Sequence, residues 1–386
     1  MPDMHSSHES VYLDHAATSV VDPRVAELVI AVMIDEFGNA GSRTHEYGLA
    51  ALRHLNKARD RLATAIGAEP DEVIFTSGAT ESDNIATLGL ADHGIASGRR
   101  HIVSTSIEHK AVLEPLALLE SRGFEVTRLA PTAAGHVRAE DVVAAMRPDT
   151  LLVSVMHANN ETGAVQPISE IASALGPDGP YLHVDAAQTF GRLTATLRNR
   201  RIDLISVSAH KVFGPKGVGA LIARRRVMRR PPLVPLMVGG GQERGLRPGT
   251  HPVPLIAGFG LAAELAAREE AVRAKVCTDI RREALAALAS LNPIIHGDET
   301  LGVLPNILSF TVPGVDSEAI MVALKGVAAI SNGSACTSSS YEPSHVLVAM
   351  GLSEDEIAGT VRMSWSHATG EVDWNEIAAR LDDLRV

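Results

Sequence analysis

The sequence predicts an α/β protein built on a mostly parallel central sheet, with a smaller α+β domain after it. Between residues 101 and 193, short apolar runs alternate with longer segments whose apolar residues recur at helical spacing. The apolar runs are continuous, which is typical of strands that helices bury on both faces. After residue 293 the runs become shorter and their order is mixed, which indicates a separate α+β unit.

The N-terminal part supplies the elements of the large domain in order. Pro23 has the fixed backbone angle that suits the first turn of a helix, and the sequence Gly-Asn-Ala-Gly-Ser at 38–42 interrupts the helical spacing. The expected strands are 11–13, 73–75, 102–103, 125–129, 151–156, 181–184, 202–207 and 220–223. The expected helices are one from Pro23 that Gly38 ends, then 48–66, 85–90, 111–121, 139–146 and 168–175.

A long Ala- and Leu-rich pattern over residues 254–291 predicts a helix, with a break, that connects two domains. Beyond it we expect strands at 307–312, 328–330 and 361–364 and helices at 317–325, 345–350 and 374–384. The expected division is an N-terminal segment, 1–22, that packs with the small domain, a large domain, 23–253, a connecting helix, 254–292, and a small C-terminal domain, 293–386.

Composition excludes several classes of function. The 46 acidic and 35 basic residues give a net charge of −11, so no overall attraction to nucleic acid or to an anionic membrane is expected. The basic run at 224–230 is expected to be a solvated loop. Two cysteines cannot form a disulfide framework, residues 1–10 lack the apolar core of a signal peptide, and no apolar run reaches membrane-spanning length, so we expect a cytoplasmic location. No metal site is expected, because no pair of histidines shows the His-x-x-x-His spacing with an intervening glutamate.

Lys211 directly follows a predicted buried strand. The apolar run 202–207 carries the chain inward, and the Gly-Pro-Lys-Gly sequence at 214–217 turns it back before a second apolar run, 220–223. A lysine so placed either extends its amine from the strand end into water or is desolvated and used as a nucleophile, as in Schiff-base enzymes. For this stretch alone, an amine that extends into water is the commoner case. The surrounding residues favour the desolvated, nucleophilic lysine instead.

Residues 76–84, with the sequence Thr-Ser-Gly-Ala-Thr-Glu-Ser-Asp-Asn, join a predicted strand to a helix. Free backbone N–H groups and the helix dipole at such a junction attract an anion, and Gly78 lets the backbone approach it closely. An ordinary helix N-cap uses the same residue types, and the stretch alone does not separate the two. The Gly-Lys-Ser/Thr ending of a Walker loop is absent.

Polar side chains follow four of the predicted strands. His109 follows 102–103, Asn160 follows 151–156, Asp185 and Gln188 follow 181–184, and Lys211 follows 202–207. The carboxyl ends of parallel strands meet at one edge of a sheet, where ligands of such sheets bind. Together with the adjacent phosphate seat, these residues fit pyridoxal phosphate (PLP) held covalently by Lys211.

Each of these residues has a role in holding such a cofactor. Asp185 would keep the pyridine nitrogen protonated, which makes the ring an electron sink, and His109 could stack on the ring. Gln188 and Asn160 could hydrogen-bond the ring substituents. Each also has a structural alternative, such as a helix cap for Asp185, a turn residue for Asn160 and a buried, satisfied histidine for His109. The residues that could reach the phosphate are Thr80, Ser208 and His210.

Cys336 lies in a run of small and hydroxylated residues, 331–340. Structural cysteines usually have apolar surroundings, as Cys277 does within the long helical pattern, so a chemical role is favoured at Cys336. A thiol in such a loop suits a nucleophile that must reach a site and then deliver its product. Arg362, on a later strand, could bind a substrate carboxylate, although a lone strand arginine also suits a surface ion pair.

Taken together, these stretches closely resemble the cysteine desulfurases of the class V aminotransferase family. The resemblance runs from residue 12 to about residue 364, and it is closest to the long-loop subgroup that includes the housekeeping and nitrogen-fixation types. The motifs that carry it are FTSGATESDN at 75–84, EHKAV at 108–112, HVDAAQ at 183–188, HK at 210–211, GPKG at 214–217 and GSACTS at 333–338.

The resemblance implies the PLP-dependent transferase fold of the aspartate aminotransferase type, with the cofactor in the large domain and the cysteine loop in the small one. It implies that Lys211 is the Schiff-base lysine, Cys336 the sulfur acceptor and His109 an acid/base residue that stacks on the cofactor. Thr250 would reach the phosphate of the other subunit, which implies a homodimer. The implied cofactor-binding residues are Ala79, Thr80, His109, Asn160, Asp185, Gln188, Ser208, His210, Lys211 and Thr250. The implied substrate-binding residues are Asn39, His45, Asn160 and Arg362.

The implied reaction converts L-cysteine to L-alanine and leaves the sulfur as a persulfide on Cys336. The sulfur would then pass to an acceptor protein, for iron–sulfur clusters, tRNA thiolation, thio-cofactors or phosphorothioate DNA. A selenocysteine lyase or another PLP aminotransferase or lyase would need Lys211 but not Cys336, and a non-enzymatic sulfur-relay scaffold would need no cofactor. The sequence departs from the family pattern at Pro248, where a serine is usual, and at 365–367, where Trp-Ser-His replaces Leu-Gly-Arg.

Overall fold

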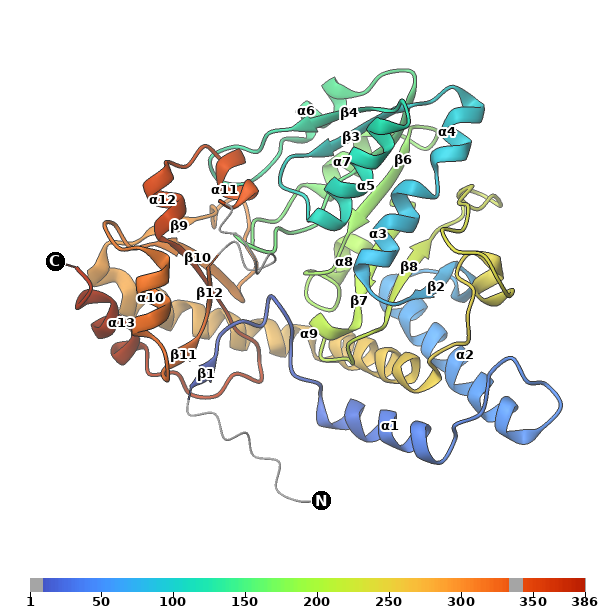
Figure 1. Ribbon diagram of the computed structural model, residues 1–386, viewed down its shortest axis with the longest axis horizontal. Coiled ribbons are helices and arrows are strands. Elements are labelled where there is room, and N and C mark those ends of the chain that lie inside the picture. Colours follow the sequence, from blue (N-terminus) through green and yellow to red (C-terminus); the bar gives the residue numbers. More distant parts are fainter. Residues whose placement is uncertain (1–9, 333–342, 386) are drawn as a thin grey trace.

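The computed structural model describes residues 10–332 and 343–385, which form a larger and a smaller unit joined by the long helix α9 (Figure 1). The strands of the larger unit are β2 (Val73–Thr76), β3 (His101–Thr105), β4 (Glu125–Leu129), β5 (Thr150–Ser154), β6 (Tyr181–Asp185), β7 (Leu204–Ser208) and β8 (Gly219–Ala223). Its helices are α1 (Pro23–Ile34), α2 (Glu46–Ile66), α3 (Ala79–Leu88), α4 (Ala91–Ser97), α5 (Lys110–Ser121), α6 (Ala139–Ala145), α7 (Ile168–Ala174) and α8 (Thr194–Leu197), with the short 3-10 helices η1 (Pro70–Glu72), η2 (Ala209–Lys211) and η3 (Gln242–Gly245).

The larger unit is organised around a seven-stranded sheet in the order β2-β8-β7-β6-β5-β3-β4. All neighbouring strands are parallel except at β8, which runs antiparallel to both β2 and β7. Alternate residues of a strand face different cores. Val73 and Phe75 pack with α2 and α9, whereas Ile74 packs with α3 and α5. The predicted mostly parallel sheet with two covered faces is therefore confirmed.

Helix α9 (Val253–Leu288) is one helix of 36 residues, so the predicted break is wrong. The two glycines in its first turns permit close packing instead of bending it. A Cβ on Gly260 would lie 2.5 Å from Cα of Ala58, so α2 and α9 cross at nearly backbone contact. The first half of α9 lies in the core of the large sheet, and Cys277, Ala284 and Leu288 lie in the core of the smaller unit.

The smaller unit combines a four-stranded sheet in the order β12-β13-β10-β9 with a two-stranded pair, β1-β11. Leu13, next to β1, is buried in the core of this unit although it lies near the start of the chain. We propose on this basis the domain division given above, including the N-terminal segment that packs with the small domain. The elements are β1 (Val11–Tyr12), η4 (Ala289–Leu291), β9 (Ile294–His296), β10 (Ile307–Thr311), α10 (Ser317–Ala323), β11 (Ala328–Ala329), β12 (Ser331–Asn332), α11 (His345–Ala349), α12 (Glu354–Gly359), β13 (Thr360–Ser364) and α13 (Trp374–Asp382).

Helix α3 begins at Ala79, six residues before the predicted helix start at residue 85. Polar residues in its first turns hid the start from a search for apolar spacing, since Ser82 and Asp83 are buried there without being apolar. The correction places the helix N-terminus directly after Gly78. The sequence also gave no signal for the short elements α8, β9, β12 and α12.

The first part of the basic run is not a solvated loop, which corrects the prediction for residues 224–226, whereas residues 227–230 are exposed. Arg224 is 1% exposed, and its guanidinium donates to four backbone carbonyls, among them Ile66 O at 2.7 Å and Leu197 O at 2.8 Å. Ile66 ends α2 and Leu197 ends α8, so one cation caps the negative ends of two helices. Its neighbours Arg225 and Arg226 form ion pairs with carboxylates of the large unit.

Among the residues that the structure describes, no helix combines the length and apolar character needed to cross a membrane.

We expect Arg224→Met to lower the free energy of unfolding by about 3 kcal/mol or more, because four carbonyls lose a charged donor in a buried site. Urea unfolding of the full chain measures this. Arg229→Met, at an exposed arginine of the same run, serves as the control and should change it by less than about 0.5 kcal/mol. Equal effects of the two substitutions would contradict the capping role.

Candidate active site

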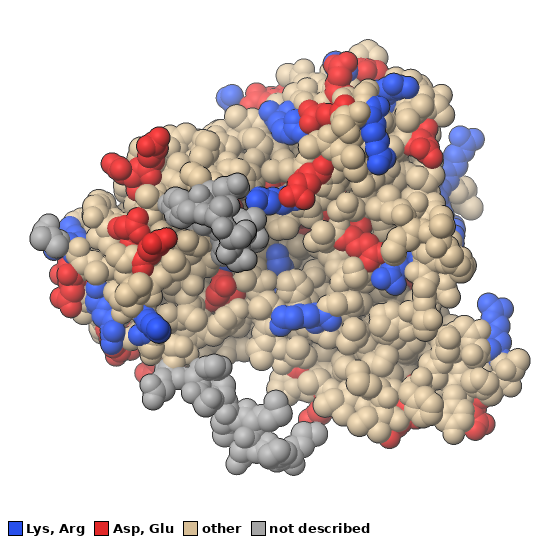
Figure 2. Space-filling view, in the orientation of Figure 1, with Lys and Arg blue, Asp and Glu red and all other residues tan. Residues whose placement is uncertain are grey.

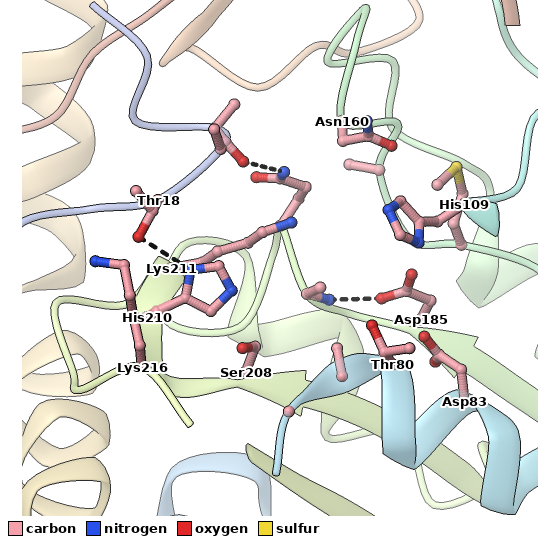
Figure 3. Close-up of a pocket in the computed structure, with 18 of the residues that line it drawn as sticks. Thr18, Thr80, Asp83, His109, Asn160, Asp185, Ser208, His210, Lys211 and Lys216 are labelled. Atoms are coloured by element: carbon pink, nitrogen blue, oxygen red, sulfur yellow. Dashed lines mark hydrogen bonds between the residues drawn. The ribbon is translucent and has the colours of Figure 1, made fainter. Parts of the chain in front are cut away.

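A cavity of about 590 Å³ lies at the carboxyl edge of the large sheet, next to the smaller unit (Figure 3). It is open to ten of the residues predicted for the site, which reach it from six separate stretches of the chain. Those residues are Ala79, Thr80, His109, Asn160, Asp185, Gln188, Ser208, His210, Lys211 and Arg362.

Lys211 is held at the mouth of the β7–β8 hairpin. Strand β7 ends at Ser208, and one turn of 3-10 helix, η2, carries the chain to Lys211, whose side chain extends into the cavity in Figure 3. Arg192 Nη2 donates a hydrogen bond to the backbone oxygen of Lys211 at 2.8 Å, which helps to hold the backbone of Lys211 in place. The position fits a lysine that reacts with an aldehyde in the cavity.

Asp185 and His109 approach the cavity from neighbouring strand ends. Asp185 is the last residue of β6, and its Oδ1 accepts a hydrogen bond from the Ala187 N–H at 2.8 Å. His109 caps α5, and its Nδ1 accepts from the Ala111 N–H at 3.1 Å, so a neutral ring carries its proton on Nε2. Burial lowers the pKa of His109 and raises that of Asp185. The opposite charge of a pyridinium ring would favour the ionised form of Asp185.

The predicted phosphate seat has the geometry of an anion site. Gly78 precedes α3, and a Cβ added to it would meet nothing within 4 Å. Gly219, by contrast, leaves no such space, because its Cβ would lie 2.6 Å from Cα of Gly78. The N–H groups of the first turn of α3, with the Thr80 hydroxyl, therefore face open space at the positive end of a helix.

Gln188 gives an independent test of the fit to PLP. Its Nε2 donates to Ala16 O at 2.9 Å, while its buried Oε1 has no hydrogen-bond partner in the described part of the chain. A buried oxygen without a donor is costly, and it lies in the wall of the cavity. The phenolic hydroxyl of PLP would supply the missing donor, so the donors and acceptors present fit that cofactor.

His210 and Arg362 border the cavity through contacts with the N-terminal segment. His210 Nδ1 lies 3.2 Å from Thr18 Oγ1. Arg362 pairs with Asp14 at 2.7 Å and donates to Asn160 O at 2.9 Å. Its Nε is buried and has no hydrogen-bond partner among the described residues, which leaves a donor for a substrate carboxylate.

Three predicted site residues do not line the cavity of the single chain. Asn39 and His45 lie in the segment between α1 and α2, where His45 caps α2 by accepting from Gly48 N–H at 3.2 Å. Thr250 lies in the segment before α9, and all three are exposed. In Figure 1 both segments lie at the end of the molecule opposite the smaller unit.

Cys336 lies outside the described residues. The described residues on either side of its segment are near the cavity wall. Ser331 on β12 pairs with Arg362 on β13, and His345 at the start of α11 has its Nε2 2.9 Å from Glu108 O.

The departures at 365–367 lie away from the cavity. Trp365 is buried in the core of the smaller unit, and its Nε1 donates to Cys277 O at 2.9 Å. His367 packs edge-on against Phe213, with ring centroids 4.5 Å apart. Neither they nor Pro248 line the cavity.

Among the cavity residues that were not predicted for the site, Thr18, Asp83 and Lys216 carry polar side chains that could serve a ligand. Asp83 had a usable signal, since it follows Thr80 by three residues in a helix and therefore shares its face. Thr18 and Lys216 gave none, because neither follows a predicted strand. The described residues contain no group of three or more His, Cys, Asp or Glu side chains that could hold a metal ion.

Comparisons with known proteins agree with this geometry. A model of the aminotransferase class-V family matches residues 11–374. Cysteine desulfurase IscS of Anaeromyxobacter dehalogenans (strain 2CP-C) is 47% identical over 355 residues, which cover 91% of this chain and 86% of that protein. The crystal structure of DndA from Streptomyces lividans is 52% identical, with a TM-score of 0.81, over 92% of this chain and 99% of that one. A structure of SspA in complex with cysteine is 37% identical, with a TM-score of 0.81, over 92% and 98% of the two chains.

We expect Gly219→Ala to weaken PLP binding about tenfold or more, because the new methyl group must displace the backbone of Gly78 at the phosphate seat. Titration of the cofactor-free full chain with PLP, followed by absorbance, measures the affinity. Gly241→Ala, whose Cβ would meet nothing within 4 Å, is the control and should bind as the parent does. Unchanged binding by Gly219→Ala would show that the phosphate lies elsewhere.

Proposed function

This chain belongs to the class-V aminotransferase family and is a PLP-dependent cysteine desulfurase, and on that premise we propose which of its residues carry out the reaction. The observation that supports the assignment most is the convergence of Lys211, Asp185 and His109 on one cavity beside a helix N-terminus. No single one of these residues identifies the chemistry, whereas together they match the amine, the ring partner and the stacking base that PLP requires.

When bound, PLP would supply an electron sink that withdraws electrons from the substrate Cα and stabilises the electron pair that the carbon keeps when its bond to sulfur breaks. Asp185 would hold the proton on the pyridine nitrogen, and the donors at the start of α3 would hold the phosphate together with Thr80, Ser208 and His210. Gln188 Oε1 would accept a hydrogen bond from the ring hydroxyl. Lys211 would hold the cofactor covalently, and its free amine would serve as a base beside the substrate Cα.

His109 is placed to accept a proton near the substrate. Because burial lowers its pKa, the imidazole is neutral at neutral pH and can act as a base. Its Nδ1 is already engaged by the Ala111 N–H, so the ring cannot turn over without losing that bond. Arg362 binds the substrate carboxylate through its unused Nε, and the pairing with Asp14 keeps the guanidinium in place.

Cys336 is the sulfur acceptor in this proposal. Its thiolate attacks the sulfur of the substrate, so that a sulfur–sulfur bond forms as the carbon–sulfur bond breaks. The electron pair of the broken bond stays with the carbon, which takes up a proton and leaves as L-alanine. The persulfide on Cys336 then passes its outer sulfur to a second thiol.

We further propose that the chain acts as a homodimer in the cytoplasm. Exposed apolar side chains gather in the segments that carry the three residues missing from the single-chain site: Ile34 is 66% and Phe37 68% exposed, and Val238 is 92% exposed. An exposed apolar surface of this kind favours self-association. A second copy placed there could receive Asn39, His45 and Thr250 at its own cavity.

The sulfur acceptor in this proposal is a protein. On the face shown in Figure 2, Lys and Arg side chains are interspersed with Asp and Glu, which does not favour a nucleic-acid backbone. Iron–sulfur assembly, tRNA thiolation, thio-cofactor synthesis and DNA phosphorothioation are the pathways that such a relay could feed. We propose a cytoplasmic location because the Cys336 thiol has to stay reduced.

We expect Lys211→Ala to lose the absorbance of the lysine-bound cofactor and all turnover. Cys336→Ser should keep that absorbance and lose alanine formation from cysteine by more than about 10³-fold, because the sulfur acceptor is gone. Absorbance spectra, alanine assay and mass spectrometry of the persulfide measure these outcomes, and Cys277→Ser is the control thiol. If Cys336→Ser released alanine at the parent rate, a lyase or aminotransferase would replace the present proposal. A colourless parent chain that takes up no PLP would leave only a relay scaffold.

We expect Phe37→Glu to weaken self-association about 10²-fold, because it buries an unpaired charge in the interface between copies. Sedimentation of the full chain over a range of concentrations measures the dissociation constant. Val272→Glu, at a valine that is 70% exposed on α9, is the matched control and should sediment as the parent does. A parent chain that sediments as a monomer would contradict the homodimer.

A further inference from the structure

Asp83 is a buried carboxyl group of the cavity to which the reaction above gives no task. Its side chain is 1% exposed and lines the cavity from α3. In Figure 3 it lies on the same side of the cavity as Asp185, and its negative charge acts to raise the pKa of Asp185. Two carboxyl groups are therefore buried close enough to influence each other, and one of them must serve the pyridine nitrogen.

A row of polar side chains leads away from Asp83 across the sheet. Asp83 Oδ1 lies 3.4 Å from Nε2 of His183 on β6, and no side chain or backbone group of the described residues donates a hydrogen bond to it. The same His183 nitrogen lies 3.0 Å from Ser206 Oγ on β7. The other ring nitrogen, Nδ1, lies 2.8 Å from Ser154 Oγ on β5. All three of these side chains are completely buried. Buried polar side chains add nothing to the apolar packing of a sheet, so this row calls for another explanation.

The row has two complete arrangements of protons. If Asp83 is protonated, its O–H faces His183 Nε2, and His183 carries its own proton on Nδ1, where it donates to Ser154. If Asp83 is ionised, its charge favours the proton of His183 on Nε2, and the Ser154 hydroxyl donates to Nδ1. The tautomer of His183 therefore reports whether Asp83 holds a proton.

We propose that Asp83 is a positioning residue that keeps a proton beside Asp185, so that the negative charge of the pair rests on Asp185. Like charges buried together cannot both be kept at low cost, and Asp185 has an N–H donor from Ala187 to stabilise its charge. Asp83 Oδ1, by contrast, accepts no hydrogen bond from the described residues, which favours the neutral form of Asp83. The contact of Asp185 with the pyridine nitrogen rests on the proposed function. The assignment of a proton to Asp83 does not depend on that function.

The charged and titratable groups facing Asp83 agree with this assignment. Burial raises the pKa of Asp83 to about 7, and the nearby Ser206 hydroxyl and the Lys211 charge only partly oppose this rise. His183 lies 3.4 Å from Asp83 Oδ1, but burial lowers its pKa to about 4, so the pair is not an ion pair at neutral pH. Glu108, across the site, has a pKa raised to about 8 by burial and by the neighbouring carboxylates.

The first experiment measures the stability of the full chain without PLP as a function of pH. The folded-state pKa of Asp83 is raised, so its contribution to stability is present below the unfolded pKa and is lost as the pH rises through about 7. Asp83→Asn keeps the shape of the protonated acid and has no proton to lose. We expect its urea midpoint to rise relative to the parent's between about pH 5 and about pH 8.

Any pH-independent cost of the amide cancels in that comparison. Asp92→Asn, at an exposed aspartate of α4, is the matched control and should follow the parent curve at both pH values. Parallel curves for Asp83→Asn and the parent would overturn the proposal, because Asp83 would then be ionised in the folded chain over this pH range, as it is in the unfolded chain.

The second experiment reads the tautomer of His183 by nitrogen-15 NMR of the full chain, with the signal assigned by its loss in His183→Gln. We expect the proton on Nδ1 below about pH 6 and on Nε2 above about pH 8. Asp83→Asn should abolish this pH response, because its amide has no proton to lose. A proton that stays on Nε2 at every pH in the parent, or a protonated ring at neutral pH, would overturn the proposal even if Asp83→Asn failed to fold.

Both measurements are made without cofactor or substrate. A chain that failed as a desulfurase could still show the pH response, and an active desulfurase could lack it. The two proposals therefore succeed or fail separately.

Discussion

The antiparallel pairing of β8 with two neighbours at once is the constraint on which the site depends. Gly219, at the start of β8, pairs with Ser208 at the end of β7 and with Thr76 at the end of β2. Ser208 leads into Lys211, and Thr76 leads into the phosphate seat. Gly219 thus connects the strand that leads to Lys211 with the strand that leads to the predicted anion site. Its backbone packs so closely against Gly78 that a Cβ would lie 2.6 Å from Cα of Gly78, so the two strand ends cannot shift freely.

Two connections fix the position of the smaller unit relative to the larger one, and Arg362 enters the cavity from the smaller unit. Helix α9 runs through both cores, so the units share one rigid element. Arg362 of β13 forms the second connection, because it bonds Asp14 of the N-terminal segment and the backbone of Asn160 after β5. In the proposed reaction, the substrate carboxylate would therefore bind only when the two units are packed together.

Residues that follow buried strands could be predicted from the sequence, because the carboxyl edge of a parallel sheet is known once the strands are recognised. Lys211, Asp185, Gln188 and Asn160 were found in that way. The start of α3 could not be found, since polar residues buried in a helix give no apolar period. Arg224 was misjudged because a charged run gives no sign that helix ends will meet it. Asn39, His45 and Thr250 were predicted only from the likeness to the family, because the sequence of one chain does not show whether residues distant from its cavity serve a second copy.

The loop that ends at Thr250 is tied to the phosphate seat of its own chain. Glu243 is 5% exposed and accepts bonds from Arg59, His251 and the backbone N–H of Phe75. Burial alone would raise its pKa, but His251 and Arg59 outweigh burial and lower it to about 2. The carboxylate is therefore ionised at every physiological pH and holds His251, next to Thr250, against the strand that enters residues 76–78. In the proposed homodimer, a shift of either phosphate seat would be transmitted through Glu243 to the threonine offered to the other copy, so the two cavities would be mechanically linked.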